Sequence, residues 1–383
     1  MEIKNTMLFT LNKRNDLLSK RSRESTFEFL ERSGWNISEF IRTTLNGYAE
    51  NYKPDREFIK TFKSKSDKQH NSAIFELLVY TALSNSNLTL LRHPETSTGR
   101  KPDFEAFDEG IKILIECTLA SHSFENLEEK NRKSVVEEII EEFEYFPYFI
   151  NLDFEIISKQ SISKKRFKNF IELIKIESDS VPDQELMSRY HLYEHEGWQI
   201  QVSLFRKRDF TIKQSLGFIS DNAKTIDTVK PILIALRDKK GSNYGIDTEP
   251  YIIFLNTDDL FTSEDCFSAA LFGQEGEITM NDQNTQLQSY FVASNTPINT
   301  SVSAVVFFRN FDMFTLDNSY IKVWHNPFAK NKLPIKILPF DEYVFSEFGN
   351  VLEKQIIIKK QNIFDILHID KANYMELKNE INK

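Results

Sequence analysis

The stretch GRKPDFEAFDEGIKILIECTLA, residues 99–120, determines which fold we expect for this chain. It contains two runs with strand-like alternation, KPDFEAF and IKILIECTLA, separated by the turn signal Asp-Glu-Gly. If the connecting loop has two or four residues, the hairpin register places Asp103 opposite Glu116, with both side chains on one face. Directly opposed residues of an antiparallel pair have Cβ atoms about 5 Å apart, so two carboxylates there would repel each other.

A divalent cation between these acids would remove the repulsion, since otherwise one carboxyl pKa has to rise. Such hard cations prefer oxygen ligands. The apolar run AIFELLVYTAL, residues 73–83, predicts a buried helix whose only charge is Glu76, and a buried carboxylate is costly unless it is paired or binds a metal. One helix acid and two strand acids therefore indicate a hard-cation site suited to activating water beside a phosphate. The competing interpretation is that the strand acids are solvated and that Glu76 pairs with an Arg or Lys elsewhere.

The segments FELLVYTAL, KPDF and ILIECT resemble, in this order, the PD-(D/E)xK nuclease superfamily. That family places an acid on a helix, Pro-Asp at the start of one strand and Glu-x-Lys on the next. By position, the resemblance implies that Glu76 is the helix acid, Asp103 the Pro-Asp acid and Glu116 the first residue of Glu-x-Lys. It also implies Mg²⁺ or Mn²⁺ as the cofactor, with the main-chain carbonyl of Cys117 as a further ligand. The implied fold is α/β and restriction-endonuclease-like, a mixed central sheet flanked by helices.

Thr118 stands where the family has its lysine, and a threonine hydroxyl can neither carry a positive charge nor act as a good base at neutral pH. Some superfamily members supply this lysine from a neighbouring helix. RDKKGSNYG, residues 237–245, is the best segment for that role here, and we expect Lys240 to take it, with Lys239 beside it. Lys101, just before the Pro-Asp pair, is a second option. The alternative is that the two neighbouring lysines only end a helix and complement its dipole.

A wider resemblance spans most of the chain. The blocks IRTTLNGYAENYKP, EGWQIQV, KKGSNYG, PYIIFLN and WHNPFA look like an uncharacterised bacterial group of nuclease-like proteins. The expected organisation is an N-terminal helical arm over residues 1–69, a nuclease-like core over 70–260 and a C-terminal α/β extension over 261–383. An acidic helical insertion is expected within the core near 124–146.

The composition is that of an ordinary folded protein. With 383 residues and 40% hydrophobic residues, the chain can bury a large core. Its net charge of -9 argues against a generally basic nucleic-acid-binding protein, although it leaves room for a local basic groove. Two cysteines are too few for a disulfide scaffold or a Cys-rich zinc site. No stretch has the apolar length of a signal peptide or a membrane span, so we expect a cytoplasmic protein with no membrane partner.

Two basic clusters, SKKRFK and FRKR, are candidates for contacts with nucleic-acid phosphates. A folded core could bring both onto one rim, although such runs are as often merely solvated. The candidate nucleic-acid-binding residues are Lys101, Lys164, Lys165, Arg166, Arg206, Lys207 and Arg208. His93, in LRHPETS, could face the site through the first strand, but we expect it to cap a turn.

The leading hypothesis is a Mg²⁺-dependent endonuclease that hydrolyses phosphodiester bonds, with DNA expected before RNA. Asp103 and Glu116 would bind the metal, Glu76 would bind a second ion or orient water, and a lysine would stabilise charge on the phosphorane. The alternative, motivated by Thr118, is a catalytically silent nuclease fold that binds nucleic acid or a partner protein. The resemblance also suggests a role in phage defence and leaves a homodimer open.

Overall fold

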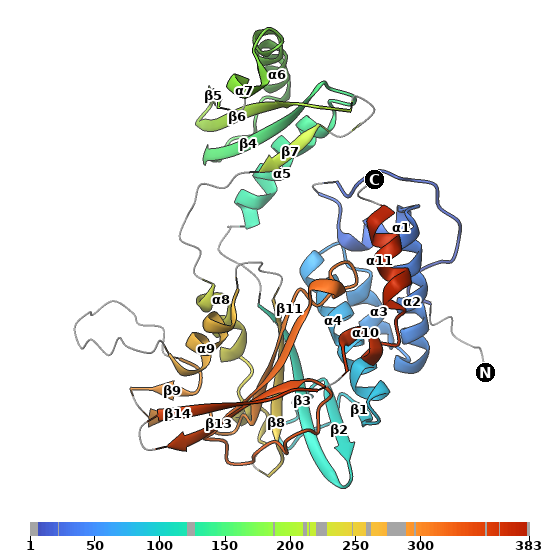
Figure 1. Ribbon diagram of the computed structural model, residues 1–383, viewed down its shortest axis with the longest axis vertical. Helices are drawn as coiled ribbons and strands as arrows, with labels where there is room; N and C mark the ends of the chain where they lie inside the picture. Colours follow the sequence, from blue (N-terminus) through green and yellow to red (C-terminus); the bar gives the residue numbers. More distant parts are fainter. Residues whose placement is uncertain are drawn as a thin grey trace. The chain divides into compact units, whose positions relative to one another are not determined.

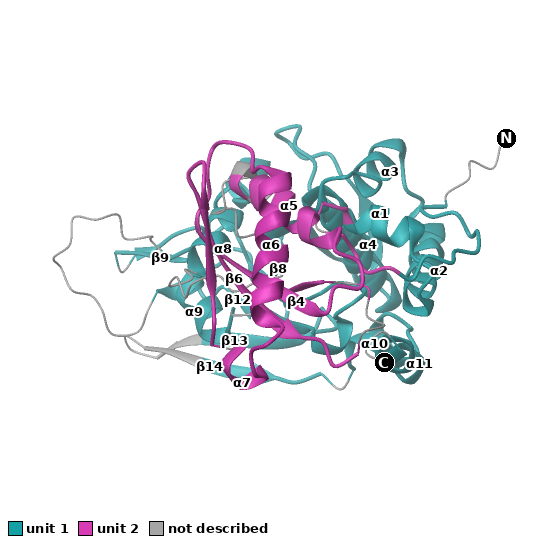
Figure 2. Cartoon of the chain, turned by 90° about the horizontal axis from the view of Figure 1, so that it is seen from above, with its two compact units in different colours: residues 1–17, 26–122, 227–383 teal, residues 18–25, 123–226 magenta. Residues whose placement is uncertain are grey.

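The computed structural model describes residues 7–21, 23–120, 127–186, 188–209, 213, 215–219, 228–246, 248–257, 262–273, 289–294, 296–348, 351–359 and 361–380. The chain divides into two compact units, distinguished by colour in Figure 2. Unit 1 comprises residues 1–17, 26–122 and 227–383, and unit 2 comprises residues 18–25 and 123–226. Each unit buries apolar side chains of its own.

Unit 1 is built around an eight-stranded mixed sheet with the order β1-β2-β3-β8-β11-β12-β13-β14 (Figure 1). Neighbouring strands are antiparallel except at β3–β8, β8–β11 and β12–β13, where they are parallel. The strands are β1 (Thr89–Arg92), β2 (Phe104–Asp108), β3 (Ile111–Ala120), β8 (Tyr251–Thr257), β11 (Ala304–Arg309), β12 (Tyr320–His325), β13 (Asp341–Phe348) and β14 (Val351–Ile357). A separate two-stranded ribbon pairs β9 (Val292–Ala293) with β10 (Thr296–Pro297).

The central strands are buried on both faces. β8 and β11 read YIIFLNT and AVVFFR, the continuous apolar runs typical of parallel strands inside an α/β protein. Successive side chains of a strand point to opposite faces. Ile252 and Phe254 accordingly enter one core cluster, whereas Ile253 and Leu255 enter the other.

Helices cover the two faces of the sheet (Figure 1). Their apolar side chains join those of the strands in two core clusters. One face packs against α1 (Thr26–Arg32), α2 (Asn36–Tyr52), α3 (Arg56–Phe62), α4 (Asp67–Asn85), α10 (Ile363–Ile366) and α11 (Lys371–Glu380). The other packs against α8 (Val229–Arg237) and α9 (Glu264–Phe272). The unit is therefore α/β with a mixed sheet between helices, as the sequence predicts. Within the described residues, no helix combines the length and apolarity that crossing a bilayer requires.

The β2–β3 hairpin has the register that the sequence predicts. Phe104 pairs with Ile115, and the strands are joined by the two-residue turn Glu109–Gly110. Both turn residues have positive φ, 45° and 88°, which is the geometry of the tight hairpin turns that match strand twist. The predicted buried helix is also present, because α4 buries side chains around its whole circumference, Ile74, Leu77 and Leu78 among them.

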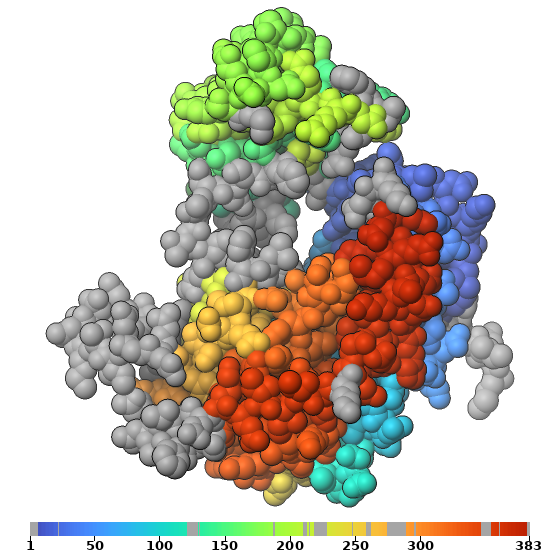
Figure 3. Space-filling view, in the orientation of Figure 1, coloured from blue at the N-terminus to red at the C-terminus, as the bar shows by residue number. Residues whose placement is uncertain are grey.

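The expected boundaries at residues 69 and 260 do not divide unit 1. The N-terminal helices bury side chains such as Leu45 in the same core cluster as the strands, so they are not a separate arm. The segment after residue 260 contributes β11–β14 to the main sheet, with β11 directly beside β8. Its last helix, α11, lies next to the N-terminal helices (Figure 3), where Asn36 donates a hydrogen bond to Glu380 at 2.7 Å. Both terminal regions, which the sequence expected to pack on a core over 70–260, share their buried residues and their sheet with it.

Unit 2 is much larger than the insertion expected near 124–146. It contains a second sheet of four strands in the order β5-β6-β4-β7. Its elements are α5 (Leu127–Glu141), β4 (Tyr148–Ile156), α6 (Lys164–Ser178), α7 (Asp183–Leu186), β5 (His191–His195), β6 (Trp198–Arg206) and β7 (Leu216–Ile219). Residues 124–126 lie outside the described part of the chain. The runs LDFEIIS and WQIQVSLFRKR predict β4 and β6, although as part of the nuclease-like core, because a strand pattern does not state which sheet the strand joins. The sequence does not predict β5 and β7.

Candidate metal centre

The candidate site lies where β2 and β3 separate. The pairing of β2 ends at Phe104 and Ile115, whereas β3 continues beside β8 as far as Ala120. Asp103 immediately precedes β2, and its Oδ2 accepts a hydrogen bond from the Cys117 backbone N–H at 2.6 Å. Beyond the last paired residues of β2 and β3, the Asp103 carboxylate thus accepts the hydrogen bond that a backbone carbonyl of β2 would otherwise accept. This bond holds the carboxylate next to β3.

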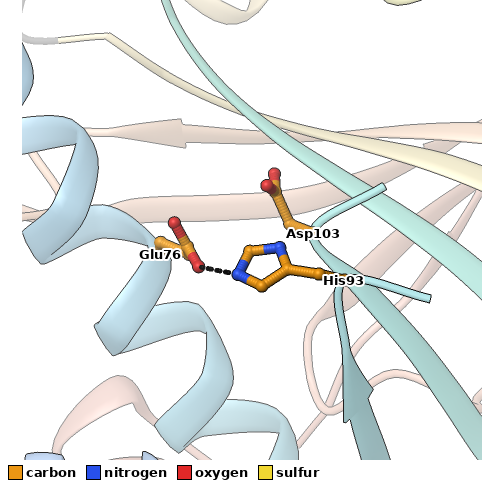
Figure 4. A group of neighbouring side chains, drawn as sticks. All are labelled: Glu76, His93 and Asp103. Carbon is orange, nitrogen blue, oxygen red and sulfur yellow. Dashed lines mark ion pairs between the residues drawn. The ribbon is translucent and has the colours of Figure 1, made fainter. Parts of the chain in front are cut away.

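The helix acid joins Asp103 at this fork (Figure 4). Glu76, on α4, and His93, directly after β1, face each other with 3.9 Å between Oε1 and Nε2. Potential ligand atoms of Glu76, His93 and Asp103 all lie within 4.8 Å of one another. His93 is held at φ 48°, and its backbone N–H donates to the Asp103 carbonyl at 3.0 Å. The imidazole expected only to cap a turn thus belongs to the site.

Glu116 is the most deeply buried of the three acids, with 4% of its surface exposed. Its Oε1 accepts a hydrogen bond from the ammonium of Lys239, which follows α8. Its Oε2 is buried and has no hydrogen bond of standard geometry with a described residue, although Tyr244 lies close enough that, after burial, Glu116 also raises the pKa of its hydroxyl. A buried carboxylate oxygen that lacks a good hydrogen bond is costly. This oxygen is therefore available to a bound cation.

The segment KKGSNYG contains two glycines at positions where a larger residue would clash. A Cβ on Gly241 would lie 2.9 Å from the Ser301 carbonyl oxygen. Gly245 has φ +63°, and a Cβ there would lie 2.5 Å from Ser97 Oγ. Only glycine permits both close approaches, and they fix the turn η1 (Gly241–Tyr244) next to Glu116. The hydroxyl of Tyr251 adds a hydrogen bond to the Lys239 carbonyl at 3.2 Å.

Glu76 is paired with a tyrosine and not with the arginine or lysine considered from the sequence. The Tyr52 hydroxyl donates a hydrogen bond to Glu76 Oε1. Arg92 stacks over the Tyr52 ring at 3.8 Å and donates to the Tyr52 and Lys53 carbonyls, both at 2.8 Å. Arg92 therefore holds the Tyr52 side chain in place. Nothing in the sequence spacing indicates Tyr52, because its contact depends on how α2 ends against α4.

The electrostatics of the fork disfavour three ionised acids. Burial, followed by the charges of Glu116 and Glu76, raises the pKa of Asp103, although the Cys117 N–H opposes this effect. Burial also raises the pKa of Glu76, against the hydrogen bond from Tyr52. Burial and the charge of Arg92 lower the pKa of His93, which keeps the imidazole neutral and able to act as a ligand. A bound cation would reverse the penalty on both acids.

The lysine is held in its charged form. Burial alone would lower the pKa of Lys239, but the charge of Glu116 and the hydrogen bond between them outweigh it and raise that pKa. Lys240, which the sequence favoured, makes no hydrogen bond or ion pair with an acid of the described chain. The lysine that contacts Glu116 is therefore Lys239 and not the neighbouring Lys240, because the chain turns directly after Lys239. Thr118 lies two residues beyond Glu116 on β3 and brings no charge.

The donor set fits a hard or borderline divalent cation. Carboxylate oxygens suit Mg²⁺ and Mn²⁺, and a neutral imidazole tolerates Mn²⁺ as well. A cation would give the buried Oε2 of Glu116 a partner, and it would lower the raised pKa of Asp103. The main-chain carbonyl of Cys117 belongs to the same strand segment. The residues present therefore fit the group that the resemblance implies.

The basic residues expected to contact nucleic acid have local partners. Lys101 pairs with Glu95 at 3.4 Å. The other six belong to unit 2, whereas the acids belong to unit 1. Lys164 pairs with Glu142 at 2.5 Å, and Arg206 pairs with Asp183 at 2.9 Å. Lys165, Arg166 and Arg208 are exposed.

Lys207 is a clear correction to that set. Only 2% of its surface is exposed, and its ammonium lies 5.3 Å from the centre of the Phe149 ring. Its backbone N–H donates to the Pro147 carbonyl at 2.9 Å, which holds this residue beside β4. A side chain folded inward in this way does not present its charge to a phosphate.

No model of a known family, no curated protein and no solved structure matches this chain.

Proposed function

We propose that this chain is a divalent-metal-dependent nuclease of the PD-(D/E)xK type, with a restriction-endonuclease-like fold in unit 1, which hydrolyses phosphodiester bonds in DNA. The observation that carries the proposal is the buried carboxylate of Glu116, whose Oε2 has no hydrogen bond of standard geometry with a described residue and whose charge adds to burial in raising the pKa of Asp103. Glu76 from α4 and Asp103 from the start of β2 form one group of possible ligands with His93, and Glu116 on β3 lies outside this group but acts on Asp103 through its charge. The sequence order of α4, β2 and β3 is that of the family's motifs.

Asp103, Glu116 and the main-chain carbonyl of Cys117 would hold Mg²⁺ or Mn²⁺, and Glu76 with His93 would complete the ligands or orient water. A cation at this position supplies neutralisation of phosphate charge and activation of water. The protein's part is positioning: the Cys117 N–H fixes Asp103, and the Tyr52 hydroxyl fixes Glu76. These groups are set before substrate binds, so little reorganisation is needed at the moment of reaction.

Lys239 would take the role of the motif lysine that Thr118 lacks. Its ammonium reaches Glu116 from the turn after α8, and its raised pKa keeps it protonated at neutral pH. A fixed positive charge beside the metal ligands would stabilise the charge that develops on the phosphorane. It would also limit the repulsion between the carboxylates and an incoming phosphodiester.

The proposal is tested by incubating the purified protein with supercoiled, linear and single-stranded DNA and with RNA, each with Mg²⁺, Mn²⁺ or EDTA. We expect cleavage that requires the metal and disappears in Asp103→Ala. Undiminished cleavage by Asp103→Ala would refute the assignment of the site. Cleavage of RNA alone would correct the substrate class but retain the chemistry.

The second candidate is a catalytically silent nuclease fold that binds nucleic acid or a partner protein. Thr118 favours it, because the strand position that usually carries the lysine is neutral. In such a protein the Lys239–Glu116 pair would be purely structural. Titration calorimetry with Mg²⁺ or Mn²⁺ separates the two candidates, since the silent protein has no need to bind metal at its acids.

A further inference from the structure

We propose that Arg100 binds a backbone phosphate of the nucleic-acid substrate next to the metal centre. This inference rests on the proposed nuclease function and adds to it a substrate-positioning residue. The sequence selected its neighbour Lys101 and passed over Arg100.

Arg100 lies on a loop whose two ends are both in the site. The loop runs from His93 to Asp103, and a backbone hydrogen bond of 3.0 Å between these two residues closes it. Within the loop, the Thr96 hydroxyl donates to the Arg100 carbonyl at 2.6 Å, which forms a compact turn. Arg100 is three residues before Asp103, so their Cα atoms are at most about 11 Å apart.

The tip of this loop docks on the turn that follows Lys239. Ser97 Oγ donates to the Gly245 carbonyl at 3.4 Å, and Thr98 Oγ1 donates to the Asn243 carbonyl at 3.3 Å. The Arg100 guanidinium lies 5.9 Å from the centre of the Tyr244 ring. These contacts join the loop and the turn into one wall of the site.

Tyr244 connects that wall to the buried acid. Burial and then the nearby charge of Glu116 raise the pKa of Tyr244, and the charge of Arg100 opposes them. The tyrosine ring therefore has Glu116 near its hydroxyl and the guanidinium over its face.

Arg100 differs from the other cations around the fork. Arg92 is committed to the Tyr52 and Lys53 carbonyls and to Asp55, and Lys239 is committed to Glu116. Lys101 pairs with Glu95. The exposed guanidinium of Arg100 has no hydrogen bond or ion pair with any described residue.

A site lined by carboxylates needs a positive charge nearby if it is to bind a phosphate, and the guanidinium of Arg100 can supply it. Three acids repel a phosphodiester, so binding needs positive charge outside the metal ligands. The planar fork of arginine donates two parallel hydrogen bonds to a phosphate, and the cation–π contact with Tyr244, 5.9 Å from the ring centre, keeps the guanidinium on this side of the loop. Because the group is exposed and has no ion pair within the described chain, a phosphate can reach it without breaking an existing contact.

The test measures binding of a short fluorescent DNA duplex in EDTA over a range of NaCl concentrations, for wild type, Arg100→Ala, Arg100→Lys and Lys101→Ala. Loss of one phosphate contact should reduce the slope of log K against log[salt] by about 0.9 in Arg100→Ala. Arg100→Lys should keep the slope but bind more weakly. In Lys101→Ala the slope should change less, because this charge is already balanced by Glu95.

Cleavage assays with Mg²⁺ complete the test. We expect Arg100→Ala to raise KM about tenfold with kcat nearly unchanged, since the contact is made equally with substrate and transition state. A wild-type slope and KM in Arg100→Ala, or a larger effect in Lys101→Ala, would overturn this inference while wild-type cleavage still supports a nuclease. A wild-type protein that neither binds nor cleaves DNA or RNA would instead overturn the proposed function, and this inference with it.

Discussion

The charged residues of the two units behave in opposite ways. In unit 1 the acids Glu76, Asp103 and Glu116 come from three separate segments, and burial followed by the charges of Glu116 and Glu76 raises the pKa of Asp103. In unit 2 the basic residues are adjacent in sequence, but Lys207 is buried, and Lys164 and Lys168 are paired at the surface with Glu142. Convergence of isolated charges that ought to be buried is therefore better evidence for a site than a run of like charges, which mostly remains solvated.

The largest effect should come from removing one acid of the fork. In Glu116→Gln we expect metal-dependent cleavage to fall about a thousandfold or more, because a ligand and the partner of Lys239 are both lost. The matched control in unit 2 is Glu142→Gln, which removes a carboxylate paired with two lysines and should leave cleavage unchanged. Equal losses in both variants would end the contrast between the units.

The next effect distinguishes Lys239 from Lys240. Lys239→Met should reduce kcat about a hundredfold, because its ammonium is held at Glu116. Lys240→Met should stay within about threefold of wild type, as expected for a surface change away from the acids. Single-turnover cleavage measures both. A stronger defect in Lys240→Met would restore the assignment favoured by the sequence.

The next effect concerns His93 and the affinity of the unit 1 site for different metals. His93→Ala should weaken Mn²⁺ binding about tenfold and Mg²⁺ binding less, since imidazole is a better ligand for Mn²⁺. Calorimetric titration of both metals measures the difference. An unchanged Mn²⁺ affinity would mean that His93 only closes the loop through its backbone.

A smaller effect concerns stability against pH. The raised pKa of Asp103 means that the metal-free folded state binds this proton more tightly than the unfolded chain does. The stability it contributes is complete below the ordinary carboxyl pKa of about 4 and is lost as pH rises through the raised value. In EDTA, the Tm of wild type should therefore fall relative to that of Asp103→Asn as pH increases. Mg²⁺ should reduce this difference, and parallel pH profiles would contradict the burial of charge at the fork.

The smallest effect belongs to the basic helix of unit 2. Replacing Lys164 and Lys168 by Ala removes two exposed ion pairs to Glu142, and such pairs contribute about 0–1 kcal/mol each. DNA binding in EDTA should change less than about twofold. A loss as large as that in Arg100→Ala would show that both units contact nucleic acid.

Much of the local structure could be predicted from the sequence. The hairpin register follows from strand alternation and a two-residue turn, and α4 follows from a long apolar run with one charge. These are local signals, set by side-chain period and turn geometry. The same signals placed Asp103 opposite Glu116.

Other parts depend on tertiary contacts that no local pattern states. The extent of unit 2 depends on which sheet β4 and β6 join, and the choice of Lys239 depends on a turn fixed by Gly241 and Gly245. Tyr52 reaches Glu76 only because of how α2 and α4 pack. His93 carried a usable signal, since it begins the loop that ends at Asp103, but a turn cap explained it equally well.

The most direct test of the shared cation site is a crystal structure of the protein soaked with Mn²⁺, with an anomalous difference map. We predict a peak at the fork of β2 and β3, within coordination distance of Asp103 and of Glu116 Oε2. A fork without a peak at saturating Mn²⁺, or a peak bound only by residues outside it, would contradict the claim that these acids exist to hold a metal.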